Sequence, residues 1–536
     1  MRQPLTGEAI LAQPFGVIAE LIAAQAARRP RQRALLQDER TLDYGALDAL
    51  MNRVAAALQR DGLGVGDAIA ICAANSIEYA VVFLGALRAG IVVAPLAPSN
   101  TAASLAAMVA DASAKLLFVD ADAAAKLSAV AAALPVPWVA LDNAGDCMAL
   151  PAWLAPPDAV PAPVAIAPEH PFNIIYSSGT TGTPKGIVQP HSMRWAHVQR
   201  APVYGYGEDC ITLLSTPLYS NTTLVSFFPT IAAGGTVVLM DRFNAAGYLE
   251  LAERHRVTHT MLVPVQYQRI MALPEFDGYD LSSFRMKLST SAPFAADLKA
   301  DIVQRWPGAL VEFYGMTEGG GTCVLNAHLH RDKLHTVGLP APGHDVRLID
   351  EAGREVSRGE AGEVVGHSGG MMTGYYRQPD QTADAEWFDA DGKRYIRTGD
   401  VGRFDAEGFL TLIDRRKDLI ISGGFNVYPS DLEGVLRGHA GIAEVAVVGV
   451  PSMRWGETPV AFVVREPDNA LDASELLAWA NARLGKLQRL YAVEFVDALP
   501  RSAIGKVLKR ELRDRYMRGQ SVVPAAFSPR ESGEGT

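Results

Sequence analysis

The residues best suited to chemistry form one short loop, Tyr176–Gly186, which reads Tyr-Ser-Ser-Gly-Thr-Thr-Gly-Thr-Pro-Lys-Gly. Its glycines let several backbone N–H groups turn toward one anion, and its hydroxyls and Lys185 add donors and positive charge. The loop lacks the Gly-Lys-Ser/Thr ending and the spacing of a Walker A loop. The sequence therefore predicts a triphosphate-binding loop of another type, against the alternative of an ordinary exposed glycine turn.

Four other segments place polar groups where the surrounding sequence is apolar or rich in glycine. Tyr314–Glu318 follows a predicted strand and offers an aromatic ring for a purine and a carboxylate for a cation. Asp400 follows Gly399 in a predicted turn, where its carboxylate could accept two ribose hydroxyls. A charged run spans Asp414–Asp418, and Lys506 lies on a predicted flexible loop. Taken singly, Tyr314–Glu318 is at least as well explained as a capped strand end. For the other three segments, a β-turn, a solvated charged face and a solvated lysine are the favoured interpretations.

Alternating helices and strands must position these segments. The apolar run Phe172–Ile175 leads as a strand into the glycine loop, and Val311–Tyr314 is a strand that ends at Tyr314. Between Phe15 and Asp120, and again after the loop, helical spacing alternates with short buried strands. Such alternation predicts an α/β fold of mostly parallel sheets covered by helices.

Length and pattern predict more than one domain, because 536 residues exceed what one core holds. From Gly353 to Ile413 helices give way to short glycine-rich strands, which predicts a small barrel-like β part. After Asp414 the pattern is that of a small α+β domain. We expect a large N-terminal domain over 1–413 and a C-terminal domain over 414–536, with Pro151–Pro171 as an extended connector inside the first.

Composition excludes several classes of function. The net charge of −10 gives no reason to expect a nucleic acid partner. The four cysteines have no CxxC or metal-ligand spacing, which favours reduced structural thiols. Neither a signal peptide nor an apolar run long enough for a membrane span is visible. These features predict a cytoplasmic protein.

In this order, the five segments resemble the motifs of the adenylate-forming superfamily, and the chain looks most like AMP-forming acyl-CoA synthetases of the 4-coumarate–CoA ligase type. The resemblance extends from about Phe15 to Arg513. It implies ATP, Mg²⁺ and CoA as cofactor and co-substrates, a small carboxylic acid as substrate, and a mobile C-terminal domain. It is also compatible with a homodimer.

The resemblance assigns roles to individual residues that bind the nucleotide. Lys185 and the loop before it match the residues that hold the β- and γ-phosphates, and Tyr314 matches the residue that packs on adenine. Asp400 and Arg415 match ribose contacts, and Glu318, with Thr181 as partner, matches the Mg²⁺ site. The remaining implied binding residues are Ser177, Ser178, Gly179, Thr180, Gly182, Ala292 and Pro293.

Other residues match the parts that carry out and separate the two half-reactions. Thr317 matches a contact to the α-phosphate, and Lys506 matches the lysine that bridges the carboxylate and that phosphate. Lys417 falls at the hinge of the C-terminal domain, and Gly423 and Gly424 match the strand edge along which a pantetheine arm runs.

The acid and the acceptor are less closely defined by the sequence. Ser220 stands where amino-acid-activating relatives carry Asp and many acyl- and aryl-CoA ligases carry His, which argues against an α-amino acid substrate. Apolar and small residues near the motifs favour a hydrophobic medium-chain or aryl acid, with Gly319–Gly321 among the expected pocket residues. Too few residues follow Arg513 for a fused carrier domain, so we expect free CoA as acceptor. The alternatives are an enzyme that loads a separate carrier protein and an inactive nucleotide-binding interaction module.

Overall fold

The chain forms two compact units, one of Met1–Thr398 with Gly402–Leu412 and one of Gly399–Val401 with Ile413–Thr536. The computed structural model describes residues 6–142, 145, 147–177, 185–415, 418–422, 425–452, 456–467, 469, 471–485, 488–501 and 507–519, and at 177, 414, 415, 421, 425 and 426 only the backbone. Within these ranges, no helix is both long and apolar enough to cross a bilayer.

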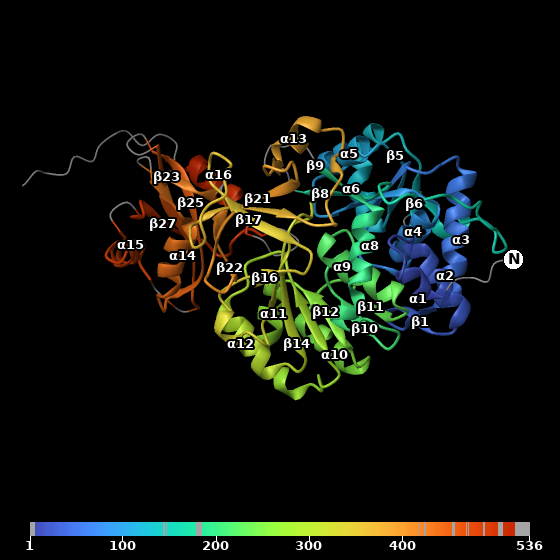
Figure 1. Ribbon diagram of the computed structural model, residues 1–536, viewed down its shortest axis with the longest axis horizontal. Helices are drawn as coiled ribbons and strands as arrows, with labels where there is room; N and C mark the ends of the chain where they lie inside the picture. The colour runs from blue at the N-terminus through green and yellow to red at the C-terminus, as the bar shows by residue number, and fades with distance from the viewer. Residues whose placement is uncertain are drawn as a thin grey trace, which may run out of the picture. The chain divides into compact units, whose positions relative to one another are not determined.

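One sheet of the first unit contains the strands that flank the glycine loop (Figure 1). Its order is β19-β9-β8-β4-β3-β5-β6-β7. Strands β3 and β4 pair in parallel and are fully buried, which is why their sequences are continuously apolar. Strand β8 joins β4 in parallel, whereas β9 runs back antiparallel to β8. The strands are β3 (Ala68–Cys72), β4 (Val92–Leu96), β5 (Ala114–Val119), β6 (Trp138–Ala140), β7 (Met148–Ala149), β8 (Pro171–Ser177), β9 (Lys185–Pro190) and β19 (Gly374–Tyr375).

A second sheet of the first unit has the order β16-β15-β14-β13-β12-β10-β11-β1-β2. Its strands are β1 (Arg33–Gln37), β2 (Arg40–Asp43), β10 (Ile211–Leu214), β11 (Thr236–Leu239), β12 (His259–Leu262), β13 (Met286–Ser289), β14 (Ala309–Tyr314), β15 (Cys323–Asn326) and β16 (Leu339–Pro340). Strands β12, β13 and β14 are parallel. The segments that follow β13 and β14 therefore leave the sheet at the same edge, where ligands of open α/β sheets bind.

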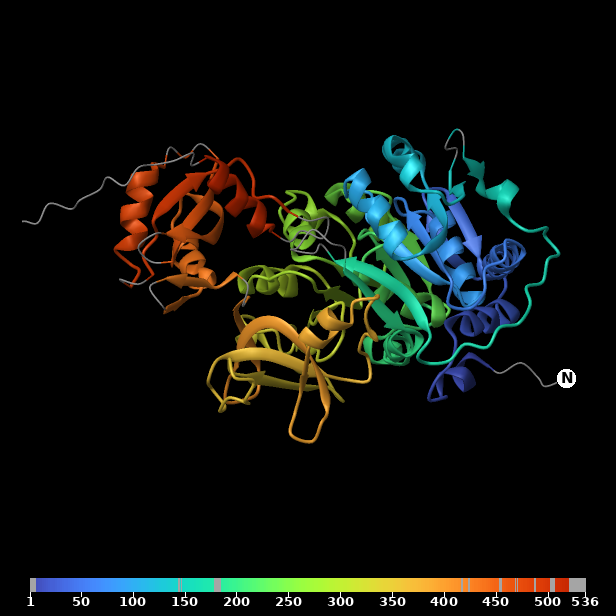
Figure 2. The same ribbon diagram turned by 90° about the horizontal axis from the view of Figure 1, so that it is seen from above.

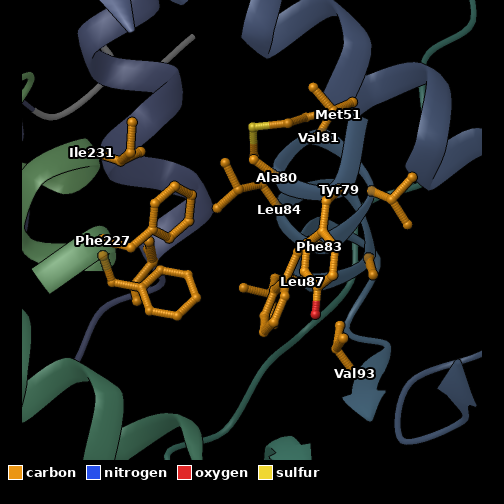
Figure 3. Packing of buried hydrophobic residues seen from close by; sticks show 14 of the residues in the cluster. Met51, Tyr79, Ala80, Val81, Phe83, Leu84, Leu87, Val93, Phe227 and Ile231 are labelled. Atoms are coloured by element: carbon orange, nitrogen blue, oxygen red, sulfur yellow. The ribbon is translucent and has the colours of Figure 1, made fainter. Parts of the chain in front are cut away.

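Helices α3 (Tyr44–Arg60), α4 (Ile77–Arg88) and α9 (Asn221–Ala232) form the core that supports these sheets. Figure 3 shows Met51, Phe83 and Phe227 from the three helices packed together. Helices α3 and α4 approach closely at Gly85, where a Cβ atom would lie 2.5 Å from that of Val54. Side-chain caps set where these helices begin; for example, the hydroxyl of Ser76 accepts the N–H of Tyr79 at 3.0 Å.

Shorter helices complete the first unit (Figure 2). The α-helices are α1 (Gly7–Leu11), α2 (Ile18–Arg28), α5 (Ala102–Asp111), α6 (Ala121–Leu127), α7 (Leu150–Trp153), α8 (His191–Gln199), α10 (Ala245–Arg254), α11 (Pro264–Met271), α12 (Ala296–Arg305) and α13 (Pro379–Asp384). The 3₁₀ turns are η1 (Ser128–Ala133), η2 (Ala201–Tyr204), η3 (Phe276–Gly278) and η4 (Arg331–Lys333).

A small sheet follows in the order β17-β18-β21-β20, with β22 also paired to β21. Its strands are β17 (Asp345–Ile349), β18 (Gly362–His367), β20 (Glu386–Phe388), β21 (Arg394–Phe404) and β22 (Leu410–Arg415). The predicted turn at Asp400 is wrong, because Thr398–Asp400 lies inside β21. Gly399 bends that strand with a φ of +70°, a conformation that glycine adopts without strain.

The second unit has its own sheet, in the order β24-β23-β26-β25 with β27 beside β26. Alternate residues of β25 enter different apolar clusters: Val445 and Val447 pack with α14 and α15, and Ala446 and Val448 pack with α16. Its elements are β23 (Ile420–Ser422), β24 (Phe425–Val427), α14 (Pro429–Arg437), β25 (Ile442–Ser452), β26 (Gly456–Arg465), α15 (Ala473–Asn481), β27 (Ala492–Phe495) and α16 (Lys509–Gly519).

The predicted α/β class is confirmed. The predicted strand Phe172–Ile175 lies within β8, and the predicted strand Val311–Tyr314 lies within β14. The predicted connector Pro151–Pro171 begins differently, with the short helix α7, where Pro151 occupies a first-turn position that needs no backbone N–H.

Candidate active site

Strands β8 and β9 flank the predicted phosphate loop, with Ser177 paired opposite Lys185. Of the predicted phosphate contacts, Ser178, Gly179, Thr180, Thr181 and Gly182 lie outside the described residues, and only the backbone of Ser177 is described. Lys185 is described in full. Its Nζ lies 5.2 Å from the centre of the Tyr375 ring, a distance at which a cation is attracted to the ring face.

Tyr375 joins Lys185 to Glu318. The Tyr375 hydroxyl donates to Oε1 of Glu318 at 3.0 Å. Burial, and then the neighbouring Glu318 carboxylate, raise the pKa of Tyr375, so its hydroxyl keeps its proton and remains a donor. The Lys185 cation, the Tyr375 ring and the Glu318 carboxylate therefore lie next to one another in space, in this order. Lys185 and Glu318 are residues predicted to bind the nucleotide and its metal.

The turn after β14 is held against the segment that precedes β19. Met372 donates its backbone N–H to the carbonyl of Glu318 at 2.7 Å. Gly319 has a φ of +79°, and a Cβ atom there would lie 2.1 Å from the carbonyl oxygen of Gly370. Gly320 and Gly321 are similarly close to Gly366. These glycines allow two backbone segments to approach each other, and their place in an acyl pocket stays a prediction.

Thr317, the predicted α-phosphate contact, is positioned through its carbonyl. Gln189 on β9 donates its side-chain N–H to that carbonyl at 2.6 Å. The side-chain oxygen of Gln189 in turn accepts from the guanidinium of Arg194 on α8.

Arg194 is fully buried and its described partners are amides rather than carboxylates. It donates to Oδ1 of Asn221 at 2.8 Å and twice to Oδ1 of Asn173 at 3.3 Å. One terminal nitrogen has no hydrogen-bond partner among the described residues. The rings of Phe172 and Phe228 lie within 6 Å of the guanidinium. Burial lowers the pKa of Arg194 to about 9, so it is charged at neutral pH.

Ser220, which stands where relatives carry Asp or His, lies at the start of α9. Ser220 caps this helix by accepting the N–H of Thr222 at 3.3 Å. The hydroxyls of Thr222 and Ser291 are 2.5 Å apart. Ser291 has a φ of +83°, a strained conformation for a non-glycine residue, and it directly precedes Ala292 and Pro293. Such strain persists where surrounding contacts enforce it, and here it shapes the segment predicted to line the base.

The other predicted residues are distributed as follows. Tyr314 ends β14 opposite Cys323 and is half-buried. Asp400 is half-exposed on β21, and Arg415 ends β22, where only its backbone is described. Outside the described residues lie Lys417, Gly423, Gly424 and Lys506.

Sequence reasoning missed Tyr375, Gln189, Arg194 and Asn221. Gln189 carried a signal, because it is a polar residue in the apolar run of β9 and is fully buried. The importance of Tyr375 had no local signal, since its partners Lys185 and Glu318 are distant in sequence.

The three buried cysteines, Cys72, Cys210 and Cys323, keep their protons. Burial raises the pKa of Cys72 and Cys323 to about 12 and that of Cys210 to about 11. Cys210 lies 3.2 Å from Nδ1 of His259, but burial lowers the pKa of that imidazole to about 4. A thiol and an imidazole that both stay neutral do not form a nucleophilic pair.

Comparison with known proteins places this geometry in context. Residues 22–376 match the family model "AMP-binding enzyme", and residues 431–506 match "AMP-binding enzyme C-terminal domain". The chain is 35% identical over 492 residues to a feruloyl-CoA synthase of Amycolatopsis sp, covering 91% of this chain and 96% of that one. It is 33% identical over 511 residues to a fatty acid–[acyl-carrier-protein] ligase of Streptomyces coeruleorubidus, with coverages of 93% and 96%.

A solved structure is also similar. ATP-bound MatB from Rhodopseudomonas palustris superposes with a TM-score of 0.82 at 30% identity, covering 93% of this chain and 99% of that one.

Proposed function

Because the chain belongs to the AMP-binding enzyme family of adenylate-forming ligases, we propose that it is an ATP-dependent carboxylic acid–CoA ligase. It forms an acyl-adenylate and pyrophosphate, and then transfers the acyl group to CoA with release of AMP. One observation carries the proposal: Tyr375 contacts both Lys185 and Glu318, beside the turn at Thr317 that Gln189 holds by a hydrogen bond.

Activation is needed because a carboxylate has no usable leaving group. Attack on the α-phosphate of ATP yields an adenylate, from which AMP departs readily. This step brings two anions together, so the enzyme must neutralise their repulsion. Lys185 acts on the departing pyrophosphate and Lys506 on the carboxylate and the α-phosphate; loss of such an electrostatic group costs about 3–4 kcal/mol of barrier.

Tyr314 packs on the adenine, with Ala292 and Pro293 beside it, and Asp400 and Arg415 hold the ribose. Ser177, Ser178, Gly179, Thr180 and Gly182 surround the phosphates. Gln189 and Arg194 act through Thr317, because they hold its backbone in place rather than touch the nucleotide.

Glu318 and Thr181 would hold Mg²⁺. The Glu318 carboxylate fits this role, because Tyr375 contacts both it and Lys185, the residue proposed to bind the phosphates. It also offers the oxygen ligands that Mg²⁺ prefers. When bound, the ion supplies positive charge to the phosphates.

The second half-reaction needs different groups at the same centre. We propose that the domain over 414–536 turns about Lys417, which removes Lys506 and presents Gly423 and Gly424 to the pantetheine arm.

The substrate is a medium-chain or aryl carboxylic acid. The feruloyl-CoA synthase relative, named for an aryl acid, supports this class. A second candidate is loading of a separate carrier protein, favoured by the relative named as an acyl-carrier-protein ligase.

One assay separates the two candidates. The purified chain is incubated with ATP, Mg²⁺ and a panel of aryl and aliphatic acids, and AMP release is measured with CoA alone and with an acyl carrier protein alone. Release with CoA alone supports the CoA ligase, and release that requires the protein supports the carrier-loading enzyme. Absence of pyrophosphate from every acid would contradict both.

The variant Lys506→Ala tests whether Lys506 acts in the first half-reaction and not in the second. It should lose adenylate formation yet still convert a supplied acyl-adenylate to the thioester. Unchanged pyrophosphate exchange would remove Lys506 from the first half-reaction.

A further inference from the structure

Three basic residues of the first unit, His197, Arg200 and His344, form a cluster that has no role in the reaction proposed above. His197 is on α8, Arg200 caps the C-terminus of that helix, and His344 precedes β17. His197 and Arg200 are three residues apart, so they project from the same side of the helix end. All three are close enough for Arg200 to lower the pKa values of both imidazoles.

The tautomer of His344 follows from its one hydrogen bond. Its Nδ1 accepts the backbone N–H of Thr322 at 3.0 Å. Burial, and then Arg200, lower the pKa of His344 to about 4, so the ring is neutral at physiological pH. A neutral imidazole that accepts at Nδ1 carries its proton on Nε2. That Nε2 is buried and has no partner among the described residues, so it is an unsatisfied donor.

The neighbouring groups are also unsatisfied. Nδ1 of His197 is buried without a hydrogen-bond partner in the described part of the chain. Arg200 is partly buried, and burial lowers its pKa. Burial and neighbouring basic groups lower the pKa values of both imidazoles, and burial lowers that of Arg200 against the opposing effect of Tyr204. A partly buried guanidinium beside buried, orphaned polar atoms is stabilised when an anion meets it.

This cluster adjoins the segments that enclose the reacting groups. Thr322 directly follows the turn that carries Thr317 and Glu318, and His344 is bonded to it. Tyr204, beside Arg200, packs edge-on against Phe313 at 5.1 Å, and Phe313 directly precedes Tyr314. Arg194 on α8 therefore reaches the Thr317 turn through Gln189, and Tyr204, in the 3₁₀ turn that follows α8, packs against Phe313.

We propose that His197, Arg200 and His344 bind a second acidic group carried by the carboxylic acid substrate, so that the enzyme prefers dicarboxylic acids. The inference rests on the proposed ligase function and refines its substrate class. Arg200 provides the charge, and the Nε2–H of His344 donates a hydrogen bond to the same carboxylate.

The probe acids carry their two carboxyl groups at opposite ends of an extended or aryl chain, so that one group can react while the other meets the cluster. Para-carboxycinnamate and octanedioate are suitable probes, and cinnamate and octanoate are their matched single acids.

The test compares AMP release with CoA for each pair of acids. The wild-type chain should use para-carboxycinnamate or octanedioate with a higher kcat/KM than the matched single acid. Arg200→Gln should lower the ratio of diacid to single-acid kcat/KM by about tenfold to hundredfold, because a charge-assisted contact is lost. Arg242→Gln is the matched control, since the Arg242 side chain is 78% exposed.

A second variant isolates the His344 donor. His344→Asn keeps a side-chain acceptor for the N–H of Thr322 but removes the Nε2–H group. It should lower the same ratio by about tenfold. Because the ratio is measured on one preparation, partial misfolding cancels from it.

Several outcomes would overturn the proposal. A wild-type preference for the single acids, or an equal change for both members of a pair, would show that the cluster does not bind the acid. A rise in the KM for ATP with every acid would assign the cluster to a phosphate instead. Absence of AMP from single acids and diacids alike would instead mark failure of the proposed ligase function.

Discussion

Two buried cations of the first unit, Lys299 and Arg194, are neutralised in opposite ways. Lys299 on α12 is 1% exposed and lies 2.5 Å from the carboxylate of Glu312, which is 4% exposed. Arg194 is as deeply buried, but its partners among the described residues are side-chain amides and aromatic rings. The Lys299 pair joins a helix to β14 and leaves no net charge. Arg194 keeps its charge next to the turn that carries Thr317, where negatively charged phosphates are proposed to bind.

The comparison indicates that Lys299 serves stability, whereas Arg194 serves the site at some cost in stability. A carboxylate beside Arg194 would neutralise it, but it would also repel the phosphates. Amide oxygens satisfy the guanidinium donors without adding negative charge.

The largest expected effect comes from breaking the Lys299 pair. Lys299→Met leaves the Glu312 carboxylate buried without its cation and should lower the free energy of unfolding by about 3–5 kcal/mol. Denaturant titration measures this change. The double variant Lys299→Met/Glu312→Leu should recover most of the loss, and failure to recover would mean that packing, rather than charge, is responsible.

The exposed pair Arg242–Asp122 provides the control. Both side chains are at least 78% exposed, so Arg242→Met should change the free energy of unfolding by less than about 1 kcal/mol.

Removing Arg194 should affect activity more than stability. Arg194→Met leaves neutral amides rather than a charge unpaired, so unfolding should become easier by only about 1–3 kcal/mol. Pyrophosphate release should fall about a hundredfold, because Gln189 and Asn221 lose the partner that positions them and Thr317 shifts. Arg194→Lys should restore part of the rate. Unchanged activity per folded molecule would contradict a positioning role.

Converting the Arg194 site to the Lys299 arrangement should separate the two properties. Gln189→Glu gives Arg194 a carboxylate partner but removes the donor to the Thr317 carbonyl. We expect an unchanged or higher free energy of unfolding together with about tenfold slower adenylate formation. If the rate of adenylate formation and the free energy of unfolding change in the same direction, the charge of the cation's partner does not explain the difference between the Arg194 and Lys299 sites.

A third buried cation, Lys287, should affect how the free energy of unfolding depends on pH. Lys287 donates to the carbonyls of Trp306, Pro307 and Gly308 at 3.0, 2.6 and 2.7 Å. Burial lowers the pKa of this lysine to about 7 from its ordinary value of 10.5.

Between these two pKa values the unfolded chain binds a proton that the folded chain lacks, so the free energy of unfolding should rise with pH. The rise is at most about 1.4 kcal/mol per pH unit above pH 7. Denaturant titrations of wild type and Lys287→Met between pH 6 and 9 measure it as a difference. A constant difference would mean that the three carbonyls keep the proton on Lys287.

Much of the fold was predictable because the signals are local. The continuously apolar β3 and the apolar strand before the glycine loop could be identified from short windows. The turn at Thr398–Asp400 was mispredicted for the opposite reason, because Gly399 bends a strand whose pairing depends on distant residues.

The sequence by itself determined two motifs of this protein, the glycine loop ending in Lys185 and the aromatic–acid motif at Tyr314–Glu318. It also determined the family, which the comparisons confirm. Only the tertiary structure decided which side chains support them. Tyr375 meets Glu318 across 57 positions and Gln189 reaches Thr317 across 128. A buried cation such as Arg194 is defined by what surrounds it, and that depends on packing between segments distant in the chain.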